Sequence, residues 1–149
     1  MAYSAMQVAN AFIQKALDGK IPDLTPMKLQ KLMFFAQSWY LKKYRVRLIN
    51  DEFVRWRFGP VIQSVYYEFS SVGGGLLTEN KVFARDARGE IVTPSIASND
   101  DAFLDAIVHA YGNYSGWQLS DMSHAAGGAW LMQPQGSIIT NVEMFNGRV

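Results

Sequence analysis

TPMKLQKLMFFAQ, from Thr25 to Gln37, is the stretch of sequence that decides the fold. Thr25 can cap a helix, and Pro26 suits the first helical position because its missing N–H has no partner there. The apolar residues that follow share one face at about 100° per residue: Leu29, Leu32, Met33, Ala36 and Tyr40. Phe34 and Phe35 lie on other faces. A helix that is apolar nearly all round is either central in its domain or shares a face with a partner.

Further helices are predicted on both sides of this one. Capping boxes, in which a hydroxyl and a glutamine or glutamate satisfy each other's backbone N–H groups, occur at three places: Ser4 with Gln7, Ser115 with Gln118, and Thr140 with Glu143. Asn99, followed by two aspartates, is predicted to start another helix, which Gly112 ends. The sequence therefore predicts a mostly helical chain.

A minor β element is expected between residues 54 and 93. Val54, Trp56 and Phe58 alternate with Arg55 and Arg57, which predicts a strand with the apolar side chains buried and the arginines solvated. Gly59-Pro60 is expected to end this strand, with Pro60 opening a helix that runs to Phe69. A small hairpin is predicted between residues 81–85 and 90–93.

Composition limits the class of protein. At 149 residues and 49% hydrophobic, the chain is predicted to form a single compact helical domain over residues 1–149, mostly α (α+β), with a small β-strand and hairpin element. There are no cysteines, no leader-like N-terminus and no apolar run long enough to cross a membrane, so we expect a cytoplasmic location. The net charge of +1 gives no strong field for nucleic acid.

Candidate catalytic and metal-binding residues are few. Ser120, Asp121 and His124 fall on one helical turn, where a nucleophile, base and orienting group rarely reach the geometry that catalysis needs. His109 and His124 are the only histidines, and no metal-ligand spacing accompanies them. We therefore expect a non-enzymatic protein without a cofactor or metal.

A basic cluster provides the alternative interpretation. It consists of Lys42, Lys43, Arg45 and Arg47, continued by Arg55 and Arg57. Lysine and arginine on one surface are sufficient for phosphate-backbone contacts. The second hypothesis is therefore a nucleic-acid-binding regulator. The low net charge and the lack of a recognition motif argue against it.

Three ordered blocks resemble a known family. Residues 25–37 resemble the TPxKLQKLxYFAQ helix of the Panacea domain, the SocA-like antitoxin domain, which is related to the phage-associated GepA-like proteins. Residues 53–61, FVRWRFGPV, resemble its FxAWxYGPV block, and residues 119–130 resemble its LSxxTH…PW block. The departures are Arg55 for alanine, Ser123 for threonine and Ala129 for proline.

The resemblance implies a helical antitoxin that neutralises a cognate protein toxin by direct binding, with a link to delivery of toxins to an AAA+ protease. Members of the family also occur in phages and other mobile elements. The family-motif positions are Lys28, Gln30, Lys31, Gly59, Pro60, His124 and Trp130. On the predicted helix, Lys28, Lys31 and Phe35 lie opposite the main apolar stripe. They either contact the toxin, or Phe35 packs under a loop while the lysines are solvated.

Overall fold

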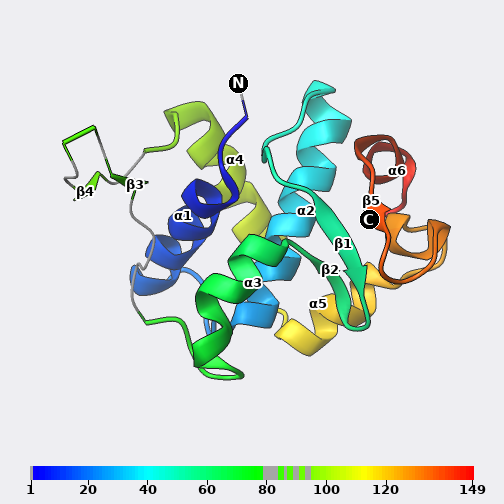
Figure 1. Cartoon of the computed structure of the whole chain (residues 1–149), viewed down its shortest axis with the longest axis horizontal. Helices are drawn as coiled ribbons and strands as arrows, with labels where there is room; N and C mark the ends of the chain where they lie inside the picture. Colours follow the sequence, from blue (N-terminus) through cyan, green and yellow to red (C-terminus); the bar gives the residue numbers. More distant parts are fainter. Residues whose placement is uncertain (1, 79–83, 86, 89–90, 93–94) are drawn as a thin grey trace.

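Helix α2 (Pro26–Tyr44) occupies the centre of the computed structural model, which describes residues 2–78, 84–85, 87–88, 91–92 and 95–149 (Figure 1). Thr25 caps it, since its Oγ1 accepts a hydrogen bond from the Lys28 backbone N–H at 3.2 Å. Twelve of its residues are buried, on all of its faces. The helix is therefore central, as its all-round apolar sequence indicates.

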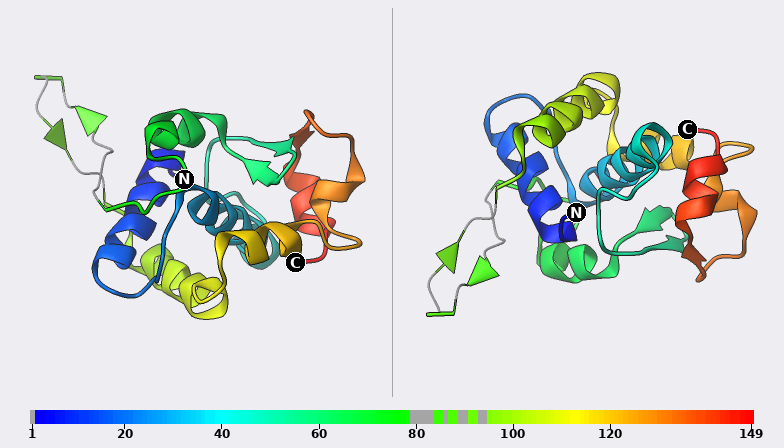
Figure 2. Two further views of the ribbon diagram at one scale, coloured as in Figure 1. Left: turned by 90° about the horizontal axis from the view of Figure 1, so that it is seen from below. Right: turned by 90° about the horizontal axis from the view of Figure 1, so that it is seen from above.

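Five other described helices surround α2 (Figures 1 and 2). They are α1 (Ala5–Leu17), α3 (Gln63–Phe69), α4 (Ser98–Tyr111), α5 (Gly116–Ser123) and α6 (Asn141–Asn146), with short 3-10 turns at Ser70–Val72 and Ala129–Met132. All three predicted capping boxes form, at the starts of α1, α5 and α6. The prediction of a mostly helical α+β fold is confirmed.

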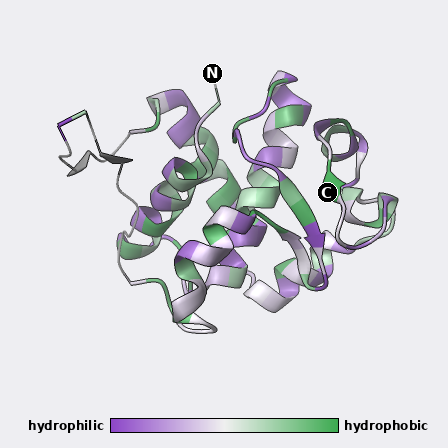
Figure 3. Ribbon diagram, in the orientation of Figure 1, coloured by the Kyte–Doolittle hydropathy of each residue, from purple (hydrophilic) through white to green (hydrophobic). Residues whose placement is uncertain are grey.

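The core is one cluster built around α2, with residues from all the other helices and from the sheet, and Figure 3 shows hydrophobic stretches of α4 and β1. Phe12, Leu32 and Leu104 are fully buried. Phe35, also buried, stacks on Tyr111 with the ring centroids 4.4 Å apart. Because each fully buried large apolar side chain contributes roughly 1.5–3 kcal/mol, these contacts fix the position of α2 against its neighbours.

A three-stranded antiparallel sheet lies beside the helices, in the order β2-β1-β5. Its strands are β1 (Phe53–Trp56), β2 (Gly59–Val61) and β5 (Ile138–Ile139). Pro60 pairs with Arg55 across the β1–β2 hairpin, and α3 begins only at Gln63. The prediction that Pro60 opens a helix is wrong. Strand β2 lies at the edge of the sheet. A proline is tolerated in an edge strand because the position of its missing N–H can face solvent, where no neighbouring strand needs a donor.

In β1, the residues that are buried and those that are partly exposed alternate in the opposite order to the predicted one. Phe53 and Arg55 are buried, whereas Val54 and Trp56 are only partly covered. Phe58, predicted to be buried, is 46% exposed. Arg55 turns inward because the C-terminal segment supplies partners for its guanidinium, and simple alternation of apolar and charged residues does not reveal such partners.

The remaining expectations concern residues 81–111. Strands β3 (Ala84–Arg85) and β4 (Ile91–Val92) pair antiparallel, so the predicted hairpin is confirmed where it is described, and the rest of it lies outside the described residues. Asn99 does not start α4, which begins at Ser98. Within the described part of the chain, no helix is long and apolar enough to cross a membrane.

Candidate functional site

Gln30 joins α2 to the end of the β1–β2 hairpin. Its Nε2 donates to the Ile62 carbonyl oxygen, and its Oε1 accepts from the Ile62 N–H, both at 2.9 Å. The glutamine is buried, so it satisfies backbone groups that water cannot reach. This family-motif residue therefore holds the hairpin on α2.

Lys28 is buried, contrary to the expectation of a solvated side chain. Its Nζ donates to the carbonyl oxygens of Pro22 and Gly112, each at 2.6 Å. Burial lowers the pKa of this amine, and the nearby Asp23 charge opposes that shift. Lys28 thus links the loop before α2 to the end of α4, and it is a structural residue in this fold.

Lys31 is also buried, with only 1% of its surface exposed. Its Nζ donates to the Pro60 carbonyl oxygen at 3.3 Å, a long hydrogen bond for a charged donor. Burial lowers the pKa of Lys31 to about 7. The expectation of a solvated side chain is wrong here too, because the β1–β2 hairpin covers Lys31.

Gly59 allows this close packing. Its φ of +112° lies in the range that favours glycine, and a Cβ there would stand 2.5 Å from Lys31 Cε and 2.7 Å from Ser123 Oγ. A larger residue at this position would force the Lys31 and Ser123 side chains to shift. The Gly59-Pro60 pair therefore belongs to the packing of the hairpin on Lys31.

We expect Gly59→Ala to lower the free energy of unfolding by about 2–3 kcal/mol, through backbone strain and overpacking. Gly73→Ala is the matched control, since Gly73 also has a positive φ, +62°, but its Cβ would meet nothing within 4 Å. Urea denaturation measures both variants. Equal losses in the two would show that the contact with Lys31 and Ser123 is unimportant.

His124 and Trp130 lie against the same hairpin. Their ring centroids are 4.0 Å apart, and Trp130 Nε1 donates to the Trp56 carbonyl oxygen at 3.0 Å. Burial lowers the pKa of His124, and the Lys31 charge lowers it further, while Asp121 opposes the shift. Six of the predicted site residues are thus brought together around the β1–β2 hairpin: Gln30, Lys31, Gly59, Pro60, His124 and Trp130. Lys28 and Phe35 lie apart from them, in the contacts with α4.

The Ser120 hydroxyl has a structural partner. It donates to the Phe58 carbonyl oxygen at 2.6 Å, while Ser123 donates to the Ser120 carbonyl oxygen, also at 2.6 Å. Within the described residues, no group of three or more histidine or acidic side chains could hold a metal ion. The contacts made by this turn therefore fix α5 to the hairpin.

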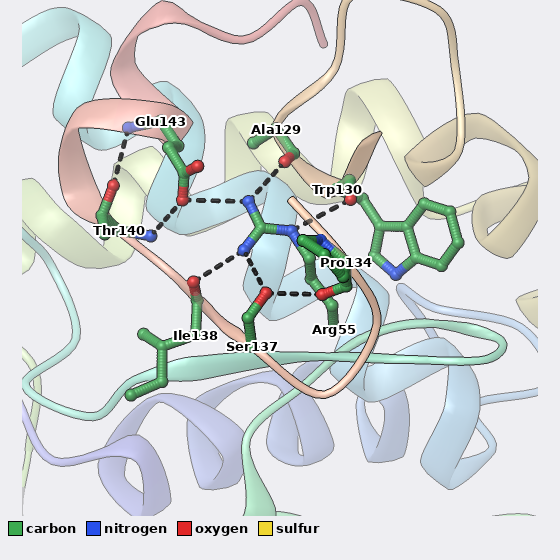
Figure 4. A network of polar contacts seen from close by, with 8 residues as sticks. All are labelled: Arg55, Ala129, Trp130, Pro134, Ser137, Ile138, Thr140 and Glu143. Carbon is green, nitrogen blue, oxygen red and sulfur yellow. Dashed lines mark hydrogen bonds and ion pairs between the residues drawn. The ribbon is translucent and has the colours of Figure 1, made fainter. Parts of the chain in front are cut away.

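Arg55 is the largest polar residue that the sequence analysis placed wrongly. Its guanidinium donates to the carbonyl oxygens of Ala129, Trp130 and Ile138 and to the Ser137 hydroxyl, at 2.6–3.1 Å (Figure 4). Its Nη2 also lies 2.9 Å from Glu143 Oε1. Burial disfavours the charged form of Glu143, but hydrogen bonds from Thr140 and Arg55 outweigh it and lower its pKa. This network attaches the C-terminal segment to β1.

The predicted basic cluster is only partly at the surface of the structure. Lys42 Nζ donates to the carbonyl oxygens of Phe145 and Gly147, at 2.7 and 2.6 Å, and Arg55 is fully buried. Arg57 lies at the β1–β2 turn, beside Phe58, whereas Arg45 lies against Phe145 of α6. Lys43, Arg45 and Arg47 remain exposed near the end of α2, so part of the predicted basic surface is present, but the buried Arg55 does not belong to it.

Two adjoining hollows open beside the β1–β2 turn. The first, about 460 Å³, lies between this turn, the start of α2, and α3. The second, about 550 Å³, lies between the turn and the start of α5. They share Met27, Phe58 and Gly73, and we call the two together the aromatic furrow. The furrow was not predictable from the sequence, because its walls come from four separate segments and an aromatic residue type alone does not indicate whether the side chain is exposed.

The fold and this furrow define a mostly helical protein whose family-motif residues are largely internal. Comparison with known proteins identifies the class. A family described as "Antitoxin SocA-like, Panacea domain" matches residues 29–131. The chain is also 33% identical over 129 residues to "Antitoxin SocA" of Caulobacter vibrioides (strain NA1000 / CB15N). The aligned residues cover 85% of this chain and 68% of that protein. No solved structure shows significant similarity. The chain belongs to the SocA-like antitoxin family with a Panacea domain.

Proposed function

We propose that this chain is the antitoxin of a toxin–antitoxin pair and neutralises its cognate toxin by binding it directly. The observation that carries the proposal is the similarity to an antitoxin over most of both chains. The domain formed by residues 1–149 acts as the binding unit, in the cytoplasm and without a catalytic step of its own. The aromatic furrow supports this function, because it offers exposed aromatic side chains of the kind that dominate binding energy in protein interfaces.

Delivery of the toxin to an AAA+ protease is an extension of the same proposal, since it also begins with toxin binding. A nucleic-acid-binding role has less support, because two of the basic residues on which it depends are used within the fold: Arg55 is buried, and Lys42 donates to backbone carbonyl oxygens. The family-motif residues contribute to function by holding the hairpin that forms one wall of the furrow. Direct contact with the toxin is expected from the exposed residues of that wall.

Co-expression with the product of the adjacent open reading frame tests this function. We expect that product to arrest growth when expressed alone, and this chain to restore growth and to copurify with it. Toxin half-life, measured with and without this chain, separates protease delivery from neutralisation by binding alone. The proposal is wrong if the neighbour is harmless, or if it remains toxic and does not bind this chain.

A further inference from the structure

The aromatic furrow has exposed ring anchors on both sides of its shared middle. Phe58, at the turn, is 46% exposed, Tyr66 of α3 is 43% exposed, and Trp117 of α5 is 60% exposed. Such large apolar surfaces cost free energy in water, and they mark interaction sites when they gather around a concave surface. The furrow therefore presents hydrophobic surface that a partner could bury.

These rings are held in place before any partner binds. Tyr66 packs edge-on against Trp56 with the ring centroids 4.7 Å apart, and Phe58 packs edge-on against Trp117 at 5.1 Å. Phe58 is further fixed through its carbonyl oxygen, which accepts the Ser120 hydroxyl hydrogen bond. When a partner binds here, these rings lose little additional side-chain entropy, because they are already ordered.

The charge of the first hollow has a single sign. Lys31 and Arg57 are its charged lining residues, and no carboxylate lines it within the described part of the chain. The Arg57 guanidinium lies 5.3 Å from the centroid of the exposed Phe58 ring, so this cation stands beside an apolar anchor. The matching surface on a partner is therefore apolar with an adjacent negative charge.

We propose that the aromatic furrow binds a short segment of the toxin that inserts apolar side chains beside Phe58, Tyr66 and Trp117 and pairs an aspartate or glutamate with Arg57. The inference rests on the proposed antitoxin function and adds the surface and the chemistry of its partner. Arginine is suited to this role since its planar guanidinium can bind a carboxylate through two hydrogen bonds. The apolar contacts supply most of the affinity, and the ion pair supplies selectivity.

The test uses the full chain and the purified product of the adjacent open reading frame, with binding measured by calorimetry. We expect Tyr66→Ala and Trp117→Ala each to weaken binding by at least about 30-fold, as for hot-spot residues. We expect Arg57→Glu to weaken it by about 10–100-fold and to slow association most at low salt. Thermal unfolding of each variant checks that the fold is retained.

Matched controls lie elsewhere on the surface. Tyr44→Ala removes a tyrosine of nearly the same exposure, 44%, from the far end of α2. Arg47→Glu reverses an exposed arginine outside the furrow. We expect both controls to bind within about threefold of the unchanged chain, because surface residues outside an interface contribute little to it. A charge swap completes the test: when the toxin aspartate or glutamate that pairs with Arg57 is changed to lysine, we expect binding to the Arg57→Glu variant to be restored.

The possible failures are distinguishable. If the unchanged chain does not bind the neighbour's product, both the antitoxin function and the furrow proposal are overturned. If it binds and the three furrow variants bind equally well, the furrow proposal alone is overturned. The same holds if Arg57→Glu strengthens binding, or if light scattering shows a dimer of this chain that Tyr66→Ala dissociates, since the furrow would then hold a second copy.

Discussion

Arg55→Met is expected to lower the free energy of unfolding by about 3–5 kcal/mol, the cost of leaving a buried charge without its partner. The methionine fills similar space but donates nothing to three carbonyl oxygens, to the Ser137 hydroxyl or to the Glu143 carboxylate. Glu143 is mostly covered, with 16% of its side chain exposed. Urea denaturation followed by circular dichroism measures the loss.

Two further variants separate charge from packing. Glu143→Gln keeps an acceptor for Arg55, so we expect a loss of only about 1–2 kcal/mol. The double variant Arg55→Met with Glu143→Met removes both charges and is expected to recover part of the loss of Arg55→Met. A loss below about 1 kcal/mol for Arg55→Met would contradict the structural importance of the network.

Lys31→Met is expected to stabilise the fold and to remove a pH dependence. Burial lowers the pKa of Lys31 from 10.5 to about 7. Between these two values the unfolded chain binds the proton more strongly than the folded one, so stability rises with pH across this window. The unfavourable contribution of the charged Lys31 is fully present below pH 7. The slope is at most about 1.4 kcal/mol per pH unit.

Urea denaturation between pH 7.5 and 9 checks this prediction. In that range we expect the unchanged chain to gain about 1–2 kcal/mol, and Lys31→Met to change much less. His124, whose pKa is lowered from 6.5, does not contribute to the slope in this window. Lys43→Met, which removes an exposed lysine from the same helix, is the control and should keep the slope. A Lys31→Met chain with the same slope as the unchanged one rules out Lys31 as the titrating group.

The starts of α1, α2, α5 and α6 were predictable because their signals are local, whereas the start of α3 was not. Thr25-Pro26 and the three capping boxes each place hydrogen-bonding groups within three residues of one another, and tertiary contacts do not alter them. The start of α4 was placed one residue late because no side chain caps it. Asp100 instead accepts hydrogen bonds from the Tyr3 and Tyr40 hydroxyls, at 2.6 and 2.8 Å.

The sheet and the burial of the cations were not predictable in the same way. Alternation along β1 suggested solvated arginines, yet Arg55 is buried by partners from a segment far along the chain. Strand β5 is two residues long, too short to show any alternation. Lys28 and Lys31 were expected at the surface because lysine is rarely buried without partners. Their partners are backbone carbonyl oxygens, which no side-chain pattern indicates.

The family motif identified candidate positions without revealing their roles. Gln30, Gly59 and Trp130 hold the hairpin in place, whereas the exposed anchors Phe58 and Trp117 are the proposed contacts. A sequence motif shows which residue types occur together at a fixed spacing. It does not show whether a residue is exposed, because solvent exposure depends on every segment that packs around that residue. Whether the motif residues also touch the toxin stays a prediction.

The Arg55 network has a consequence for the order of events during protein synthesis. The β1–β2 hairpin can form soon after its own residues leave the ribosome, since the two strands are adjacent in sequence. Among the described residues, however, the partners of the Arg55 guanidinium all come from the segment between Ala129 and Glu143. At about 5–20 residues per second, translation delays these partners by several seconds. The nascent chain therefore carries Arg55 without these partners until β5 and Glu143 have been synthesised, and β5 completes the sheet.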